Sequence, residues 1–381
     1  MKVRRTVVFP ISPSESQIKS LAKTRDLYCK ACGECVDVAW EMEEPNGTSV
    51  HDRTYYKLKA KLGLKSQYLC SARNKAVEMV KSAKALIKSG KKVSKPKVGR
   101  IPIRLDGRTL SFDKTRENAS IATQDGRIKV PLNWHKQAKR YEAWDCEAGE
   151  IGKDRKGRWV IRLIFKKIFS KPERTGRVVG GDRGIKKPLV TSDNKFLGKP
   201  EWKEREKKYL SHIARLQSKG TRSAKRRLKK IKGRLRRFKQ DCDYRIAKEL
   251  MAGLRPGDTF VHEKLTNIRD HCGRKGQANK KHRRYVGRWS FKRLENIINY
   301  IAETMGIYIG YVDPRYTSQT CSKCGIVCKN NRKSQSLYSC SCGCRLNADL
   351  NAARNIAQKW CIANGNTHGS RVNRPFVEAS P

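Results

Sequence analysis

The sequence predicts a multidomain protein, with an α+β region in the N-terminal half and an α/β domain in the C-terminal half. The hydrophobic period is helical over residues 14–88 and becomes two over residues 101–165, as expected for helices followed by antiparallel strands. From residue 178 onward, strand-like segments alternate with helical ones, which is the order of an α/β sheet. A length of 381 residues is enough for two or three domains.

The N-terminal half begins with one strand and continues with three helices. Residues 3–10 alternate in polarity as a strand does, and Ser14 followed by an acidic residue is a helix-start signal. Helical spacing then continues to about Glu44. Two more helices are expected near residues 51–62 and 64–88.

A basic, proline-containing linker at residues 91–100 leads to a run of short strands. Apolar and polar residues alternate between Ile101 and Phe165, and Asp-Gly and Lys-Gly turns divide the run. We expect a small antiparallel β-barrel here. We also expect the opening strand at residues 3–10 to return to this barrel, so that the three helices form an insertion in it.

The C-terminal half predicts strands around a long, strongly basic helical hairpin. Apolar residues step by three and four from Leu228 to Leu250, which indicates one stripe of an amphipathic helix. Between Glu201 and Gln240 there are 17 basic and 3 acidic residues, and Gly220 marks the bend. The other expected elements are strands near residues 178–192, 258–265 and 307–312, a helix over 289–306 and a last helix that carries Asp349.

The charge of the chain indicates a polyanionic partner. Lysine and arginine number 87 against 35 acidic residues, a formal net charge of +52, which favours nucleic acid. A solvated, charged helix is the plain alternative for the basic hairpin, but the net charge favours phosphate contact. No apolar run approaches the roughly 18 residues of a membrane-spanning helix. Residues 1–10 lack the apolar core of a signal peptide, so we expect an intracellular protein.

Two close cysteine pairs predict a structural zinc site. Cys321 and Cys324 form a C-x-x-C-Gly knuckle, and Cys340 and Cys342 form a C-x-C-Gly pair a short loop later. In a reducing compartment, paired cysteines bind metal more often than one another. Four thiolates are the ligands of a closed, tetrahedral Zn²⁺ site. Free cysteines in a loop are the plain alternative.

Other cysteines leave two questions open. Cys328 and Cys344 are spare ligand candidates, and Cys344 could complete the zinc site in place of Cys342. A third group, Cys29–Cys35, has the spacing of an iron–sulfur run, but the fourth position is Ala39. On a helix, these three cysteines are expected to face the core as small hydrophobes.

Three carboxylates stand at the ends of predicted elements. Asp182 ends a β-run between glycines, Glu263 ends the next strand and Asp349 begins the last long helix. Burying an ionised carboxylate costs free energy unless a cation pairs with it. The three together could hold two Mg²⁺ ions for phosphodiester hydrolysis, although each alone could be an ordinary turn or capping acid. His262 is expected to project to the opposite face of its strand from Glu263.

Four segments carry a resemblance to a known family. Val-Gly-Gly-Asp-Arg-Gly-Ile-Lys, Val-His-Glu-Lys-Leu and Asn-Ala-Asp-Leu-Asn-Ala-Ala-Arg-Asn-Ile resemble the three split pieces of a RuvC-type nuclease. Tyr-Thr-Ser-Gln-Thr-Cys-Ser-Lys-Cys-Gly lies between the last two. In this order, the segments closely resemble the TnpB proteins of bacterial and archaeal insertion sequences, which are relatives of the type V CRISPR effectors. The match runs from about Val178 to Ile356, roughly half of the chain.

The resemblance implies a transposon-encoded, RNA-guided DNA endonuclease that cuts beside a short motif in its target. It assigns catalytic Mg²⁺ binding to Asp182, Glu263 and Asp349. The implied partners are a guide RNA from the element's end and double-stranded target DNA, in the cytoplasm or nucleoid of a bacterium or archaeon. The phosphate contacts expected on the basic hairpin are Lys225, Arg226, Arg227, Lys229, Lys230, Arg234, Arg236 and Arg237.

The resemblance also implies an RNase H-like (RuvC) nuclease domain with an inserted zinc ribbon, preceded by a wedge β-barrel that carries a helical recognition insertion. The expected domains are residues 1–10 for the first wedge strand, 11–98 for the recognition domain, 99–172 for the wedge barrel, 173–316 for the nuclease domain with its basic hairpin at 201–252, 317–346 for the zinc ribbon, 347–360 for the last nuclease helix and 361–381 for a C-terminal tail.

Three other functions compete with this interpretation. A compact type V CRISPR effector would share the motifs, and gene neighbourhood would separate the two. A nuclease-inactive, RNA-guided repressor of the same ancestry is disfavoured because all three acids are present. Direct DNA transposition ranks last, because the sequence offers no tyrosine or serine recombinase constellation.

Overall fold

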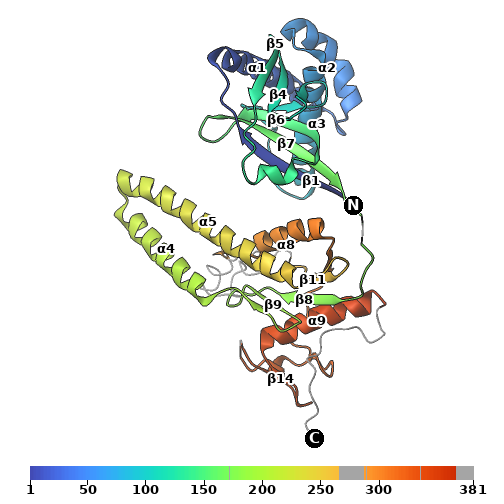
Figure 1. Cartoon of the computed structure of the whole chain (residues 1–381), viewed down its shortest axis with the longest axis vertical. Helices are drawn as coiled ribbons and strands as arrows, with labels where there is room; N and C mark the ends of the chain where they lie inside the picture. The colour runs from blue at the N-terminus through green and yellow to red at the C-terminus, as the bar shows by residue number, and fades with distance from the viewer. Residues whose placement is uncertain (171, 266–286, 289, 335, 366–381) are drawn as a thin grey trace. The chain divides into compact units, whose positions relative to one another are not determined.

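The computed structural model describes residues 1–170, 172–265, 287–288, 290–334 and 336–365 (Figure 1). The chain divides into two compact units, Met1–Ile168 and Phe169–Pro381. In the described part of the chain, none of the helices combines the length and the apolar composition needed to span a bilayer.

Three helices follow the first strand in the N-terminal unit. They are α1 (Glu15–Glu41), α2 (Gly47–Leu62) and α3 (Ser66–Lys88). The predicted start of α1 is confirmed, because Ser14 and Gln17 form a reciprocal capping box there. Helix α1 ends at Glu41, three residues before the predicted end, since Met42 has an extended backbone. Cys32 and Cys35 are buried in the core, as expected of small hydrophobes on a helix, whereas Cys29 is only half-buried.

The strands of this unit form two antiparallel sheets. The first has the order β1-β7-β6-β2, and the second has the order β3-β4-β5. Strand β1 pairs with β7 along its whole length, so the predicted return of the opening strand is confirmed. The bounds are β1 (Lys2–Pro10), β2 (Ile103–Leu105), β3 (Leu110–Phe112), β4 (Asn118–Thr123), β5 (Gly126–Pro131), β6 (Asp145–Lys153) and β7 (Trp159–Ile168), with the 3-10 helix η1 at Ala138–Tyr141.

The prediction of one closed barrel was wrong. A barrel needs an unbroken ladder around its circumference, whereas β1 and β2 are the two edges of the first sheet and no described ladder joins it to the second. The break lies between β2 and β3. There the Asp106 carboxylate accepts the backbone N–H groups of Arg108 and Thr109, and this tight turn directs the chain out of one sheet and into the other.

A five-stranded mixed sheet forms the centre of the C-terminal unit, in the order β10-β9-β8-β11-β12. Strands β8, β11 and β12 run parallel, and β9 and β10 are antiparallel additions at one side. The carboxyl ends of the three parallel strands therefore meet at one edge. The bounds are β8 (Val178–Asp182), β9 (Leu189–Thr191), β10 (Phe196–Leu197), β11 (Thr259–Glu263) and β12 (Tyr308–Val312).

Helices cover both faces of this sheet (Figure 1). Helices α5 (Arg222–Ala252) and α8 (Phe291–Met305) share a core with one face, which includes Ile246, Leu250, Phe260 and Ile298. Helix α9 (Ala348–Ala363) packs on the other face, against Val178, Val261 and Val312. The predicted α/β architecture is thus observed as a three-layer arrangement in this unit.

Glycines in β8 let helix α9 lie directly against the sheet. A Cβ atom at Gly180 would stand 2.2 Å from the carbonyl oxygen of Ala353 and 2.6 Å from the nitrogen of Ala357. A Cβ atom at Gly181 would stand 2.4 Å from the ring of Phe260 in β11. No larger residue fits at either position without displacing its neighbour, so Gly180 allows the close approach of α9 to β8, and Gly181 leaves room for the ring of Phe260.

The basic hairpin consists of α4 (Pro200–Lys219) and α5, and Gly220 separates them in a left-handed conformation (φ 63°). A small apolar seam holds the two helices together, and it includes Ile213, Leu216 and Ile231. The predicted hairpin, its bend and its apolar stripe are therefore confirmed. The chain reverses at Gly220 because a residue without a Cβ atom adopts positive φ at low cost.

The last elements frame the cysteine-rich segment. Helix α8 begins at Phe291, and Trp289, where we predicted its start, lies outside the described residues. The predicted tail also lies outside them from residue 366 onward, while α9 continues to Ala363. Between β12 and α9 the chain forms η2 (Lys329–Asn331), β13 (Tyr338–Ser339) and β14 (Arg345–Leu346).

Candidate functional site

Asp182, Glu263 and Asp349 gather at the carboxyl edge of the parallel strands. Asp182 is the last residue of β8 and Glu263 is the last residue of β11, and the two strands pair directly through Gly181 and His262. Asp349 lies in the first turn of α9, the helix that packs on β8. Elements far apart in the sequence thus bring the three acids to one end of the sheet.

The fold fixes Asp349 through the N-terminus of α9. The side chain of Asn347 accepts the backbone N–H groups of Asp349 and Leu350, which is a typical N-cap. The first turn of a helix also favours a negative charge, because the partial positive end of the helix dipole lies there. Asp349 is 8% exposed and Glu263 is 7% exposed, so both carboxylates are buried, and Asp182 keeps partial exposure.

Burial and mutual repulsion make the three carboxyl groups hard to ionise together. Burial raises the pKa of Asp182 well above its usual range, and the charges of Glu263 and Asp349 raise it further. Burial also raises the pKa of Glu263 and of Asp349. The Asp182 carboxylate accepts no hydrogen bond from the described residues. A cation bound between these acids would offset both the cost of burying their charges and the repulsion among them, so the donor set fits a divalent metal.

The three carboxylates do not form a ligand cluster of the kind that the cysteines form. Among the described residues, only Cys321, Cys324, Cys340 and Cys342 bring three or more possible ligand atoms together, all within 4.8 Å of one another.

Two contacts from the segment after β12 reach the acids, and sequence reasoning missed both. The Arg332 guanidinium donates to Asp349, with Nη2 3.2 Å from Oδ1. The Thr317 hydroxyl lies 2.6 Å from Oε1 of Glu263, and both side chains are buried. Thr317 belongs to the segment that resembles TnpB, which is a usable signal. Arg332 lies in a loop with several other cations, where no pattern singles it out.

A buried arginine ties the two acid-bearing strands to helix α8. Arg183 follows Asp182 and donates one N–H to the backbone carbonyl of Glu263 at 2.7 Å. Its other terminal nitrogen lies 2.7 Å from Oε2 of Glu295 on α8. The arginine side chain is fully buried and the glutamate nearly so. Because breaking such a pair leaves an uncompensated buried charge, this contact fixes the strand ends relative to α8.

His262 lies on the other side of β11, as predicted. Its Nε2 atom is 3.2 Å from Oδ1 of Asn299 on α8, and its ring stacks on Tyr311. Burial lowers the pKa of His262 to about 3, with the nearby Arg183 charge acting in the same direction. The buried imidazole therefore lies on the α8 face, apart from the acid group.

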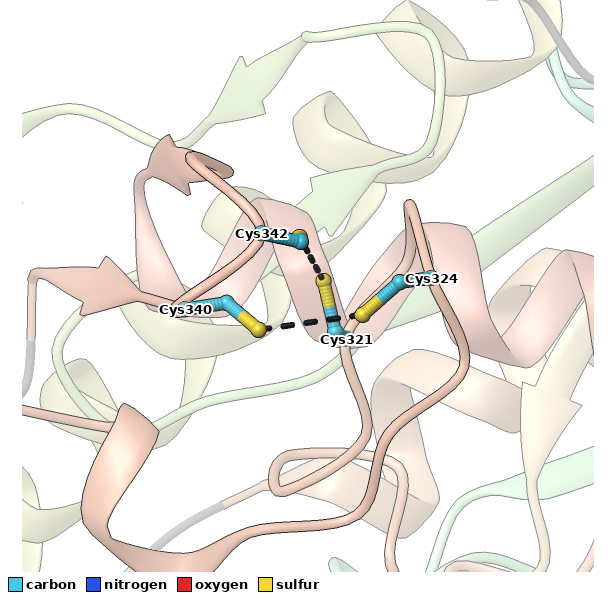
Figure 2. Close-up of side chains that lie close together, drawn as sticks. All are labelled: Cys321, Cys324, Cys340 and Cys342. Atoms are coloured by element: carbon cyan, nitrogen blue, oxygen red, sulfur yellow. Dashed lines mark hydrogen bonds between the residues drawn. The ribbon is translucent and has the colours of Figure 1, made fainter.

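The four predicted zinc ligands converge on one point (Figure 2). The sulfur atoms of Cys321, Cys324, Cys340 and Cys342 all lie within 4.8 Å of one another. The closest pairs are Cys321 with Cys342 at 3.6 Å and Cys324 with Cys340 at 3.7 Å. Cys344 is buried beside them, but it is not part of the group.

The backbone around the first knuckle favours a thiolate. Burial raises the pKa of the Cys321 thiol, but hydrogen bonds from the backbone of Cys324 and Lys323 and from the thiols of Cys324 and Cys342 together lower it to about 6. Gly325 and Gly343, which follow the two pairs, both have positive φ (78° and 81°). This conformation lets each knuckle turn its amides toward the sulfur atoms. The donor set fits a tetrahedral metal site.

The eight basic residues predicted to contact phosphate all lie on α5 and are exposed. None of them forms an ion pair with a carboxylate in the described part of the chain. Where α5 meets the start of α8 there is an open cavity of about 350 Å³, lined by Lys232, Leu235, Arg236, Lys239, Arg288, Ser290, Lys292 and Arg293. Six of these lining residues are cations, so the cavity extends the positive surface of the hairpin toward the sheet.

Comparison with known proteins supports the assignment of the C-terminal half. Residues 291–356, which hold α8, β12 and the cysteine group, match the family described as Cas12f1-like, TNB domain. A TnpB-like protein of Methanocaldococcus jannaschii is 34% identical over 134 residues, covering 35% of this chain and 46% of that protein. This part of the chain is similar to TnpB. The predicted resemblance is therefore confirmed.

Other proteins similar to this chain carry nuclease names. The CRISPR-associated endodeoxyribonuclease Cas12f1 of Sulfoacidibacillus thermotolerans is 35% identical over 133 residues, which cover 34% of this chain and 29% of that protein. A putative RNA-guided DNA endonuclease of Streptomyces pristinaespiralis is 25% identical over 231 residues, covering 59% and 55%. The chain thus matches between about a quarter and slightly more than half of the length of these curated relatives.

Two solved structures are similar in fold to this chain over most of its length. The Cas12f1 protein in a complex with sgRNA and target DNA matches with a TM-score of 0.58 at 15% identity, covering 93% of this chain and 99% of that one. A mini-RNA-guided endonuclease, CRISPR-Cas_phi3, matches with a TM-score of 0.56 at 11% identity, covering 94% and 92%. The predicted multidomain fold of mixed helices and sheets is therefore confirmed.

Proposed function

We propose that this protein is a transposon-encoded, RNA-guided DNA endonuclease that cuts target DNA beside a short motif. The observation that carries the proposal is the convergence of Asp182, Glu263 and Asp349 at the carboxyl edge of one sheet, from β8, β11 and α9. The nuclease names of the relatives support the reaction class. The domain boundaries given above belong to the same proposal.

In this function the three acids are the ligands of the catalytic metal. Mg²⁺, when bound, would activate a water molecule and stabilise the leaving oxygen during phosphodiester hydrolysis. Other side chains keep the acids in position. Arg183 joins the ends of β8 and β11, and the N-cap of α9 orients Asp349. Arg332 balances the charge of Asp349 from the cysteine-rich segment.

The positive surface is the proposed binding region for guide RNA and target DNA. A formal net charge of +52 requires a polyanion, and the eight exposed cations of α5 have no acidic partners among the described residues. The related Cas12f1 structure contains sgRNA and target DNA. A heteroduplex held through its backbone needs a channel of positive charge, which this helix and the adjoining cavity could line.

The cysteine group is proposed to bind one structural Zn²⁺ ion. Four thiol ligands without an oxygen or nitrogen donor are typical of closed zinc sites, which stabilise a fold and carry out no chemistry. The described residues between β12 and α9 form two short strands and one 3-10 turn. The core of this segment consists of the cysteines, Tyr338 and Ala348, with Leu346 against them, and a metal bound by the thiols would add stability to so small a core.

A paired assay tests the nuclease function. The protein is expressed with its flanking DNA, the RNA that co-purifies is sequenced, and a matching DNA duplex is offered with Mg²⁺. Asp182→Ala, Glu263→Ala and Asp349→Ala are each expected to abolish cleavage while the guided target is still bound, because a metal site that lacks a ligand misplaces the attacking water. Cleavage by all three variants at the parental rate would refute the assignment.

One observation favours a second candidate, a compact type V CRISPR effector. The Cas12f1 relative from Sulfoacidibacillus thermotolerans is as similar to this chain as the TnpB-like protein is. Both candidates share the site and the chemistry. A CRISPR array beside the gene and a co-purified RNA with repeat sequence would favour the effector, whereas RNA from a transposon end would favour the first proposal. Guided binding by a parent protein that never cuts would instead indicate a repressor.

A further inference from the structure

We propose that Thr317 is a positioning residue for Glu263, and that the loop before the first cysteine knuckle is thereby part of the acid site. This inference rests on the proposed nuclease function. The Thr317 hydroxyl oxygen lies 2.6 Å from Oε1 of Glu263. Thr317 is 3% exposed and Glu263 is 7% exposed, so water does not compete for this contact.

The Thr317 hydroxyl has one proton and two possible acceptors. Its oxygen lies 2.6 Å from the Glu263 carboxylate and 2.9 Å from the backbone carbonyl of Pro314. An ionised carboxylate is the stronger acceptor, because hydrogen bonds to a charged group are shorter and roughly twice as strong. When Glu263 is ionised, the proton therefore points to Oε1. That bond limits the rotation of the carboxylate, and Oε2 would remain available to a bound metal.

Helix α9 holds the Thr317 loop in place through two buried amides. The Asn355 amide donates to the backbone carbonyls of Thr317 and Thr320, both at 2.7 Å. The Asn351 amide donates to the same Thr320 carbonyl at 2.7 Å. Both asparagines are almost fully buried, so these bonds are costly to break.

The same helix holds the first cysteine knuckle. The Asn351 side-chain oxygen accepts the backbone N–H of Ser322 at 3.0 Å, and the Gln358 amide donates to the Ser322 carbonyl at 2.9 Å. Ser322 directly follows Cys321. Helix α9 thus carries Asp349 in its first turn and, further along, the residues that hold the Thr317 loop. Two of the three acids are positioned from a single helix, one directly and one through Thr317.

A purely local role for Thr317 makes a different prediction. If its hydroxyl only closed the turn onto Pro314, replacing it would lower the stability of the loop and leave the metal affinity of the acids unchanged. If it positions Glu263, the replacement Thr317→Val, which keeps the shape of the side chain, weakens metal binding. Thr317→Ser, which restores the hydroxyl, then recovers the binding.

The experiment measures Mn²⁺ binding to the full-length chain by electron paramagnetic resonance. RNA is left out because its phosphates bind Mn²⁺ themselves. Thr317→Val is expected to raise the dissociation constant about tenfold, as a hydrogen bond to a charged group would give. Thr317→Ser is expected to stay within about twofold of the parent. The metal concentration at half-maximal cleavage by the protein–RNA complex should shift in the same order.

Thr320→Val is the matched control. It is the same type of residue in the same loop, and its hydroxyl donates to the Tyr316 carbonyl at 2.8 Å without touching an acid. This variant is expected to bind Mn²⁺ like the parent. Equal weakening by Thr317→Val and Thr320→Val, or no weakening by Thr317→Val, would overturn the inference. Thermal unfolding and zinc content, measured on each variant, show whether the loop itself has been lost.

Glu263→Ala separates the failure of this inference from that of the proposed function. If Glu263→Ala loses Mn²⁺ binding and Thr317→Val does not, Thr317 has no positioning role and the nuclease proposal stands. If Glu263→Ala binds Mn²⁺ like the parent, Glu263 is not a ligand, and both proposals fail together.

Discussion

Arg332, in the cysteine-rich segment, donates to Asp349 at the start of α9 over a distance of 3.2 Å. Its positive charge also favours the ionised forms of Asp182 and Glu263. Burial raises the pKa values of these acids, and Arg332 opposes that rise. A single cation from the inserted segment therefore acts on all three carboxylates of the sheet edge.

Replacing Arg332 by glutamine is expected to shift the pH dependence of cleavage upward. Without the guanidinium the pKa values of the acids rise, so a higher pH is needed to ionise them for metal binding, and activity is lost first at low pH. A pH–rate profile of the protein–RNA complex checks this. Lys333→Gln removes a neighbouring exposed charge and should leave the profile unchanged. An Arg332→Gln profile that overlays the parent would contradict the expectation.

Gly180→Ala is expected to destabilise the protein by about 1–3 kcal/mol, because the new methyl group overlaps the backbone of α9. The displaced helix carries Asp349, so cleavage should fall as well. Gly233→Ala, within α5, provides the contrast: its Cβ atom meets only a side-chain nitrogen of Arg237 at 3.6 Å. That variant should gain about 0.5–1 kcal/mol from improved helix propensity. Denaturant unfolding of both variants measures the difference.

Cys321→Ser, Cys340→Ser and Cys342→Ser are expected to lose zinc, since each removes one of four converging sulfur ligands. Metal analysis of the parent should give about one zinc per chain. Cys344→Ser tests whether Cys342 or Cys344 is the fourth ligand, because Cys344 lies beside the group without belonging to it. Full zinc content in Cys342→Ser, together with loss in Cys344→Ser, would reverse the assignment of the fourth ligand.

Replacing Lys229, Lys230, Arg236 and Arg237 by glutamine is expected to weaken nucleic-acid binding and to flatten its salt dependence. Each lost phosphate contact should reduce the slope of log K against log salt by about 0.7 to 0.9. Binding measured at several salt concentrations gives this slope. Exchanging lysine and arginine at the same four positions keeps the charge and serves as the control. An unchanged slope in the glutamine variant would mean that this face of α5 is only solvated.

His262 is expected to make the protein sensitive to acid. Its pKa is about 3 in the folded protein and 6.5 when unperturbed, so the unfolded chain binds the proton first. The associated stability is complete above about pH 6.5 and is lost as the pH falls toward 3, at up to about 1.4 kcal/mol per pH unit. Denaturant unfolding between these pH values measures the loss. His262→Gln should show a shallower decline, and an equal decline in both proteins would exclude the histidine as its source.

The sequence could predict those parts of the fold that depend on local pattern. The stripe from Leu228 to Leu250 determines a helix by itself, and Asp182 and Glu263 are recognisable because each ends an apolar run. Whether the strands close into a barrel could not be predicted, because alternating polarity indicates strands but not which strands pair with each other. In the structure, the chain leaves the first sheet for the second at the turn of Asp106. Arg332 could not be found either, since its role depends on a loop that folds back over α9.

The placement of Asp349 on α9 has a consequence for biosynthesis. The strands that carry the first two acids are complete at Glu263, but the helix that supplies the third begins only at Ala348. Between residues 263 and 348, a chain emerging from the ribosome therefore has both strand ends but no third ligand. Under the proposed function, cutting activity arises only when α9 docks against Gly180, so the growing polypeptide is harmless to the DNA around it.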